Sequence, residues 1–215
     1  MIFKPSKHDR SVFGKLASEY GLTYFGTIVP TEVDDYTPVR GITASPEQID
    51  DNYTSGNING YNVRLLQRNH DLYLLDNRKV NRTWTICQTL LNVATTPHII
   101  ICAKNKPSGN GQALTSYLRM YEISYNSLNC PIADDFANKF AIYVSPQNID
   151  DVRRIMTPEL QAMLSVNFCD MDFELIDNEL FIYSTKQPLT LNDLDKLPRL
   201  GVWLARVIEN SLSSD

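Results

Sequence analysis

The spacing of hydrophobic residues predicts a helix at each end of the chain. Over residues 9–20, apolar residues recur at intervals of three and four, which is typical of an amphipathic helix. Asp9 is placed to cap its start, and Gly21 can adopt the left-handed conformation after its end. A second helix is predicted over residues 190–212, capped by Thr190, with leucines recurring along it. Pro198 is expected to kink or split this helix.

Between these helices, the first half of the chain has the pattern of strands. Asn59-Gly60 predicts a tight hairpin, because both central residues of a type I′ turn need a positive φ. Two further turns are predicted at residues 68–71 and 76–79. The predicted strands are residues 53–56, 61–67, 72–75, 83–93 and 97–103. The last of these is a continuous apolar run, as in a strand buried on both faces.

The second half alternates between strand and helix signals. Residues 139–144 alternate as a strand does, and Ser145-Pro146 predicts a helix start directly after it. Thr157-Pro158 predicts a second helix start. Residues 171–176 and 179–184 are expected to pair as a hairpin, with the alternating Asp172 and Glu174 on a solvated face, since acids alternate there with Phe173 and Leu175.

An internal match indicates a duplication. Residues 34–51 (DDYTPVRGITASPEQIDD) align without a gap with residues 134–151 (DDFANKFAIYVSPQNIDD), with eight identities in eighteen positions. In both copies Ser-Pro predicts a helix start, and a short helix is expected to carry the Asp-Asp pair that ends each copy. We interpret the match as one strand-to-helix corner built twice.

The predicted elements define an α+β protein. We expect a mostly antiparallel sheet made of two βαββ-like units, with helices at both ends of the chain. The halves would be residues 21–103 and 132–185, flanked by helices 9–20 and 190–212. Because neither half alone would bury much apolar surface, we expect one compact domain over residues 1–215.

Composition favours a cytoplasmic protein. The fractions of apolar and charged residues are ordinary for a globular chain, and neither a signal peptide nor an apolar run long enough to span a membrane is seen. The four cysteines lie far apart, without a C-x-x-C pair. We therefore expect them to be reduced, buried and small, with no cofactor or metal bound by them.

Four Asp-Asp pairs are the first candidate site. Clustered carboxylates bind Mg²⁺ or Ca²⁺, so a divalent-metal-dependent hydrolase or nuclease is one hypothesis. The alternative is that the acids stabilise helix starts, which we prefer because no EF-hand spacing is present and adjacent residues point in different directions. The residues concerned are Asp34, Asp35, Asp50, Asp51, Asp134, Asp135, Asp150 and Asp151.

An uneven distribution of charge is the second candidate. The chain carries a net charge of −5, yet residues 52–110 hold seven bases and two acids. Such asymmetry can mark a nucleic-acid or anion-binding surface, although the bases are dispersed and more simply line solvated strand faces. They are Arg64, Arg68, Arg78, Lys79, Arg82, Lys104 and Lys106.

Short motifs in the chain resemble a family of uncharacterised bacterial proteins. They are Phe140–Tyr143, Ile155–Leu160 and the hairpin of residues 173–183, together with residues 38–63 in the first half. The resemblance covers roughly residues 20–185. It implies no activity and no catalytic residues, and several relatives carry membrane helices before this region.

No catalytic motif such as G-x-S-x-G is present. The sequence therefore favours a non-enzymatic cytosolic binding or interaction module whose partner is a protein or a membrane surface. The metal-dependent enzyme and the nucleic-acid binder are the alternatives.

Overall fold

The computed structural model describes residues 6–28, 41, 43, 48–73, 79–104, 122–123, 125–186 and 189–213, with the side chains of residues 70–73, 79–82 and 126 left aside. Several predictions lie outside the described residues. They concern the Ser45-Pro46 helix start, the turn at residues 76–78, and the side chains of Asp34, Asp35, Arg78 and Lys106.

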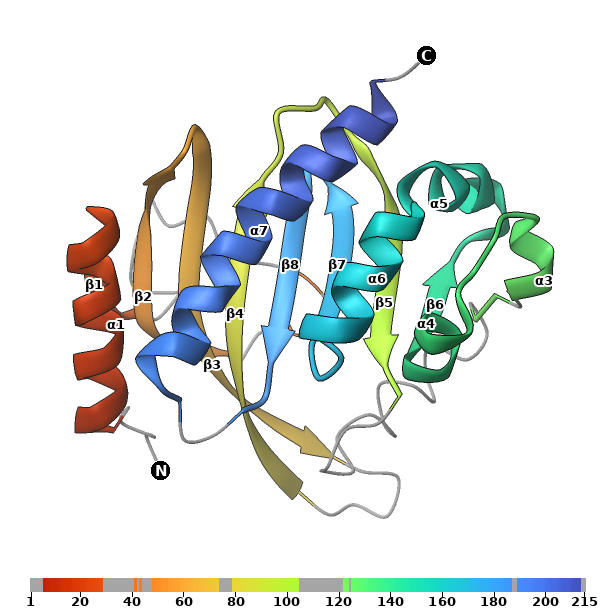
Figure 1. Ribbon diagram of the computed structural model, residues 1–215. Coiled ribbons are helices and arrows are strands. Elements are labelled where there is room, and N and C mark those ends of the chain that lie inside the picture. Colours follow the sequence, from red (N-terminus) through yellow and green to blue (C-terminus); the bar gives the residue numbers. More distant parts are fainter. Residues whose placement is uncertain are drawn as a thin grey trace. The chain divides into compact units, whose positions relative to one another are not determined.

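After the N-terminal helix, the first half of the chain contributes strands, whereas the second half contains both helices and strands (Figure 1). The helices are α1 (Lys7–Tyr20), α3 (Tyr125–Leu128), α4 (Asp134–Lys139), α5 (Ile149–Ile155), α6 (Pro158–Asn167) and α7 (Leu191–Leu212), with a 3₁₀ turn, η2, at Pro146–Asn148. The strands are β1 (Thr23–Ile28), β2 (Ile49–Ile58), β3 (Tyr61–Tyr73), β4 (Lys79–Leu90), β5 (Thr96–Ala103), β6 (Phe140–Val144), β7 (Asp172–Asp177) and β8 (Glu179–Ser184).

The strands form one eight-stranded antiparallel sheet in the order β1-β2-β3-β4-β8-β7-β5-β6. With a helix at each end of the chain, this confirms the predicted α+β class. The chain divides into two compact units. Unit 1 comprises Met1–Leu90 and Phe181–Trp203, and unit 2 comprises Leu91–Leu180 and Leu204–Asp215.

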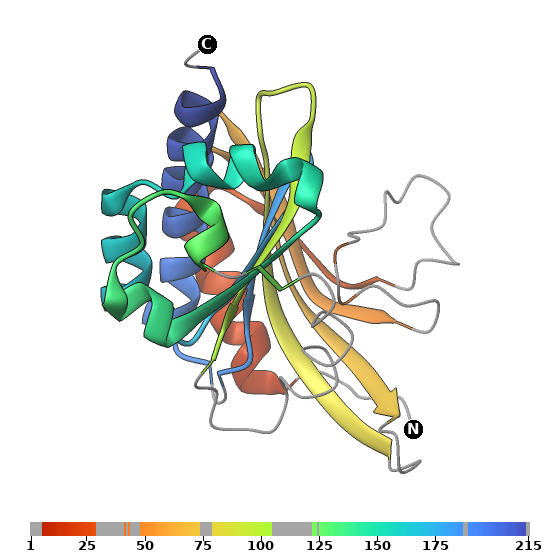
Figure 2. The ribbon, with the colours of Figure 1, turned by 90° about the vertical axis from the view of Figure 1, so that its right-hand side faces the viewer.

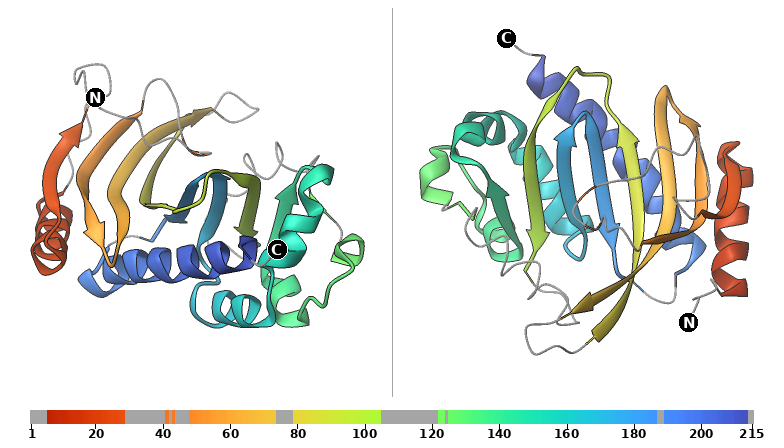
Figure 3. Two further views of the ribbon diagram at one scale, coloured as in Figure 1. Left: turned by 90° about the horizontal axis from the view of Figure 1, so that it is seen from above. Right: turned by 180° about the vertical axis from the view of Figure 1, so that it is seen from behind.

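In unit 1, α1 packs against β1 and β2 (Figure 3, left). Its apolar face buries Val12, Phe13, Leu16 and Ala17. Ser6 caps the helix by accepting a hydrogen bond from the backbone N–H of Asp9, so the prediction that Asp9 is the cap is wrong by about one helical turn. Gly21 ends the helix with a φ of 65°, as predicted.

The predicted Asn59-Gly60 turn is confirmed. It joins β2 to β3, and its two residues have φ values of 52° and 92°. The predicted turn at residues 68–71 is wrong, because β3 continues through it. There Arg68 pairs with Asp50 of β2 on one side and with Trp84 of β4 on the other. Ladder bonds to two neighbouring strands outweigh the local turn propensity.

In unit 2, the helices α4, α5 and α6 lie on one side of β5 and β6 (Figure 2). Pro146 begins the 3₁₀ turn that leads into α5, although the Ser145 side chain makes no capping bond. Thr157 caps α6 by accepting from the N–H of Leu160 at 3.3 Å, as predicted.

The hairpin of β7 and β8 forms where it was predicted, and Asp177 in its turn has a φ of 56°. The prediction that Asp172 and Glu174 face solvent is wrong, since both are buried. Asp172 accepts from the backbone N–H of Ala103 at 2.9 Å, and Glu174 pairs with His98. The alternation of acidic and apolar residues shows only that the two faces of the strand differ. The acidic face can still be buried when polar groups elsewhere in the fold supply partners for the carboxylates.

The C-terminal helix α7 begins after Thr190, whose hydroxyl accepts from the N–H of Asp193 at 3.1 Å. Pro198 does not split it, since α7 runs without a break from Leu191 to Leu212.

The predicted helix through Asp50-Asp51 is wrong. Residues 49–51 open strand β2, whereas the matching residues 149–151 open helix α5. Strand β2 is held between β1 and β3, so long-range pairing decides its conformation. The two copies of the repeat therefore differ in conformation at this end, and the first half is not a second strand-to-helix corner at Asp50-Asp51.

Candidate functional site

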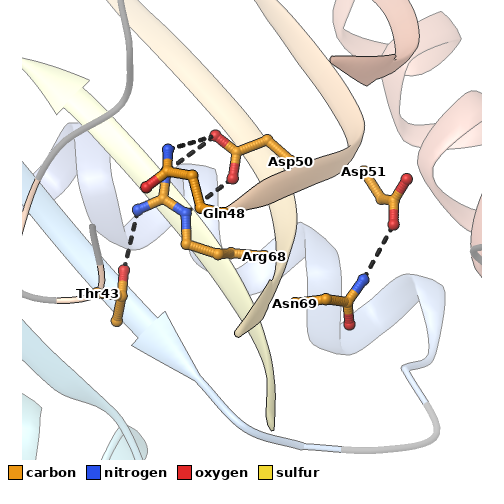
Figure 4. Close-up of polar contacts among 6 residues, drawn as sticks. All are labelled: Thr43, Gln48, Asp50, Asp51, Arg68 and Asn69. Atoms are coloured by element: carbon orange, nitrogen blue, oxygen red, sulfur yellow. Dashed lines mark hydrogen bonds and ion pairs between the residues drawn. The ribbon is translucent and has the colours of Figure 1, made fainter. Parts of the chain in front are cut away.

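The candidate site lies in unit 1, at an irregularity in the pairing of strands β2 and β3. The pairing of β2 with β3 shifts between Asp51 and Thr54, and Asn52 takes a φ of 54°, as at a β-bulge. Asp50 and Asp51 are adjacent in the strand, so their side chains leave on opposite faces. Figure 4 shows Asp50 directed toward Arg68 and Asp51 toward Asn69.

On one face, Arg68 and Asp50 form an ion pair whose two side chains are both 0 % exposed. The guanidinium donates from Nε to Oδ1 at 2.7 Å and from Nη2 to Oδ2 at 2.8 Å. Thr43 Oγ1 accepts from Nη1 at 3.1 Å, and the Gln48 amide donates to Asp50 at 3.3 Å (Figure 4). The bidentate geometry and the added polar contacts offset part of the cost of desolvating two charges.

On the opposite face, polar side chains are joined across the strands in two chains of hydrogen bonds, which we call the polar rows. In the first, Tyr24 donates to Asn52 at 2.8 Å, and Asn52 donates to Gln67 Oε1 at 2.6 Å. The second has Asp51 at its centre. The Asp51 carboxylate accepts from Thr27 at 2.6 Å and from Asn69 at 2.9 Å, and Asn69 accepts from Thr83 at 2.7 Å.

Burial raises the pKa of the Asp51 carboxyl, whereas the hydrogen bonds from Thr27 and Asn69 and the charge of Arg10 act in the opposite direction. Its partners in the second row are neutral donors. Asp51 therefore differs from Asp50, which has a guanidinium partner of opposite charge.

The remaining predicted acids of unit 2 lie in first turns of helices: Asp134 and Asp135 in α4, Asp150 and Asp151 in α5. Asp135 pairs with Lys139 at 2.9 Å, and Asp150 pairs with Arg153. In the part of the chain that the structure describes, no three His, Cys, Asp or Glu residues converge to hold a metal ion. The described residues thus contain no cluster of carboxylates that matches the metal-site hypothesis. Asp34 and Asp35 lie outside the described residues.

The predicted bases are dispersed. Arg68 is neutralised by Asp50 inside the sheet, and Arg64 donates to Gln88 at 3.1 Å. Lys104 is exposed, donates to the carbonyl of Ala137 at 2.7 Å and lies over the Tyr125 ring. Lys79 and Arg82 belong to β4. The nucleic-acid or anion-binding role of these bases therefore stays a prediction.

Two features were missed by the sequence reasoning. In unit 2, His98 Nε2 lies 2.8 Å from Glu174 Oε1, and the exposed fractions of these side chains are 49 % and 2 %. In unit 1, neighbouring aromatic residues of the sheet's terminal strand β1 are exposed, Tyr24 by 37 % and Phe25 by 57 %. Phe25 also contacts the Tyr53 ring edge-on. The uncharged run Thr23–Ile28 was the available signal for the second feature.

The four cysteines are all free thiols. Cys87 and Cys102 are buried, as predicted, whereas Cys169 is exposed just after the end of α6 and Cys130 is half-buried, so the prediction is wrong for these two. Complete burial raises the pKa of the Cys87 thiol to about 12. Cys87 therefore remains a protonated core residue at neutral pH.

Unit 2 also contains an apolar cavity of about 30 Å³. It lies between helices α5, α6 and α7 and strands β5 and β7, with Ile101, Val152, Leu160, Phe173 and Leu204 among its lining residues. This volume is close to that of one water molecule and far below the roughly 300–1,000 Å³ of ligand pockets.

These features define an α+β protein with an eight-stranded antiparallel sheet and a hydrogen-bonded polar interior in unit 1. The crystal structure of the mycobacterial trehalose monomycolate transport factor A, TtfA, has a similar fold, with a TM-score of 0.54 over 97 % of this chain and 96 % of that chain. The sequence identity is 12 %, so the likeness concerns the fold alone. No family model and no curated protein matches the sequence. No helix within the described ranges is both long and apolar enough to cross a membrane.

Proposed function

We propose that this protein is a non-enzymatic cytosolic interaction module that binds an extended segment of a protein partner along strand β1. The observation that carries the proposal is the exposure of Tyr24 and Phe25, two adjacent aromatic residues on a strand at the end of the sheet. Aromatic side chains are enriched in protein interfaces, and a sheet edge offers backbone groups to a further strand.

The composition of β1 supports this choice. Edge strands are commonly protected by charged residues or proline, but the six residues from Thr23 to Ile28 contain neither. At the other end of the sheet, β6 has additional pairing. Glu122 forms a bridge with Tyr143, and Ile123 donates to the carbonyl of Ile142 at 3.1 Å. Among the described residues, β1 has a strand partner in β2 alone.

The fold likeness supports a role other than catalysis, because the solved structure of similar fold is described as a transport factor. A lipid ligand for this chain is not supported by the apolar cavity of unit 2, because its volume of about 30 Å³ is far below the roughly 300–1,000 Å³ of ligand pockets. The free cysteines fit a reducing compartment, which supports the cytosolic assignment.

Site-specific photocrosslinking tests the proposal. A photoreactive phenylalanine analogue placed at Phe25 should give one defined crosslinked protein in the native cell. The same analogue at Val166, which is 72 % exposed on α6, is the matched control and should not capture that protein. Tyr24 carrying the analogue should capture the same partner if the strand as a whole is the contact.

A substitution of Phe25 that should abolish binding of the partner completes the test. Phe25→Ser should abolish crosslinking from Tyr24 while leaving the unfolding midpoint nearly unchanged, because Phe25 is more than half exposed. Equal crosslinking from positions 25 and 166, or persistence of the crosslink in Phe25→Ser, would count against β1 as the binding strand.

A further inference from the structure

Two buried polar groups, one at the end of the first polar row and one beside it, have no hydrogen-bond partner among the described residues. They are the Gln67 amide nitrogen Nε2 and the Thr85 hydroxyl Oγ1. Gln67 is 2 % exposed and Thr85 is 0 % exposed. An unpaired buried amide or hydroxyl is costly, and such groups are rare in native proteins unless ordered water satisfies them.

The two groups belong to one site. Gln67 of β3 lies directly opposite Thr85 of β4 in the ladder, so their side chains leave on the same face of the sheet. Cys87 and Thr89 follow on that face, and both approach Gly201 of α7. A Cβ atom added to Gly201 would lie 3.4 Å from Cys87 Sγ and 2.4 Å from Thr89 Oγ1. Helix α7 therefore closes this face further along β4.

The oxygen of the Gln67 amide already has a hydrogen-bond partner. Its Oε1 accepts from Asn52 at 2.6 Å, and this bond orients the amide so that Nε2 is the end left to donate. Rotating the amide to satisfy Nε2 elsewhere would break the bond to Asn52. The Nε2 donor of Gln67 and the hydroxyl of Thr85 are on the same face and are not hydrogen-bonded to each other, so one polar atom that contacts both would satisfy the two groups.

We propose that one ordered water molecule is bound between Gln67 Nε2 and Thr85 Oγ1. The water oxygen accepts from Nε2, and one water hydrogen is donated to Oγ1. The first polar row then extends from Tyr24 on the exposed strand β1 through Asn52 and Gln67 to Thr85 on β4. The inference does not depend on the proposed binding function of β1.

A crystal structure of the intact protein at about 1.5 Å resolution tests the site directly. The expected result is a single water peak within about 3.2 Å of both atoms. The same peak should be absent from a crystal of Thr85→Val, which keeps the shape of the side chain but removes the hydroxyl. Direct contact between Gln67 and Thr85 in the native crystal, or no peak between them, would overturn the proposal.

A double-mutant cycle supplies an independent readout in solution. Gln67→Met and Thr85→Val should each lower the denaturant midpoint. The midpoint of the double variant should fall by less than the sum of the two single decreases, because either substitution alone already removes the shared water. Strictly additive losses would contradict a shared water. Thr89→Val combined with Gln67→Met is the control pair, and its losses should add, since Thr89 lies next to Gly201 rather than opposite Gln67.

Discussion

Arg68 and Asp50 carry opposite charges into a strand ladder where neither side chain reaches solvent. A pair of this kind contributes little net stability, because desolvation of both ions offsets most of the attraction, but removing one partner leaves a buried charge without compensation. Asp51, one residue away, is held by neutral donors on the other face. The two acids of one Asp-Asp pair therefore have different chemistry, although the sequence presents them as equivalent.

Replacing Arg68 by methionine should lower the free energy of unfolding by about 3–5 kcal/mol, because the Asp50 carboxylate would remain buried without a group of opposite charge beside it. Chemical denaturation monitored by circular dichroism measures the change. Adding Asp50→Leu to the Arg68→Met chain should restore much of the loss. As a control, Lys186→Met breaks an exposed pair with Asp193 and should cost less than about 1 kcal/mol. A double variant no more stable than Arg68→Met would contradict this account.

Asp51 should make stability depend on pH. Because burial raises its pKa in the folded state above the value in the unfolded chain, the folded protein binds the proton more tightly. Relative to Asp51→Asn, the wild type should gain stability as pH falls from neutrality through the raised pKa, and the gain should be complete below the ordinary carboxyl pKa. Unfolding curves of both proteins across this range measure the difference. Parallel pH profiles would show that Asp51 titrates normally.

Helix α7 shows how an element depends on its neighbours. It contains Gly201, where a Cβ atom would lie 2.4 Å from Thr89 Oγ1 on β4, so the missing side chain permits close helix-to-strand packing. In α1, Gly14 has nothing within 4 Å of the place where a Cβ atom would lie. The same residue type thus serves different purposes in two helices of unit 1.

Opposite effects are expected from alanine at these two glycines. Gly201→Ala should destabilise the protein by about 1–3 kcal/mol through overpacking. Gly14→Ala should stabilise it by about 0.5–1 kcal/mol, because alanine favours the helix at no steric cost there. Thermal unfolding of both variants checks the signs. Thr89→Ala added to Gly201→Ala should recover part of the loss, and failure to do so would place the strain elsewhere.

At the scale of the whole molecule, the eight-stranded sheet joins strands far apart in sequence, such as β4 and β8. Acids of both units are engaged by nearby bases: Asp50 by Arg68, Asp135 by Lys139 and Asp150 by Arg153. A divalent cation that bound to any of these three carboxylates would have to displace a base.

Millimolar Mg²⁺ or Ca²⁺ should therefore leave the melting temperature of the protein unchanged within about 1 °C, since a ligand stabilises only as far as it binds the folded state. A thermal-shift titration of the intact chain, with matched ionic strength as the control, makes the measurement. A rise of several degrees with either metal would support the metal-dependent hypothesis and direct attention to Asp34 and Asp35.

Local signals in the sequence were sufficient to locate several elements. Apolar periodicity located α1 and α7, Asn59-Gly60 located the β2–β3 hairpin, and Thr157-Pro158 located the start of α6. Each of these depends on residues close together in the chain, so the local sequence contains the information. The α+β class followed from the sum of such signals.

Tertiary structure decided the rest. Asp50-Asp51 and Asp150-Asp151 share the sequence Ile-Asp-Asp, yet one pair lies in a strand and the other in a helix, because β2 is paired on both sides. Arg68 resembled a turn residue and is buried, and Asp172 and Glu174 resembled a solvated face and are buried with distant partners. Whether a polar residue is exposed depends on which remote group satisfies it, and that partner is known only once the strands have been brought together.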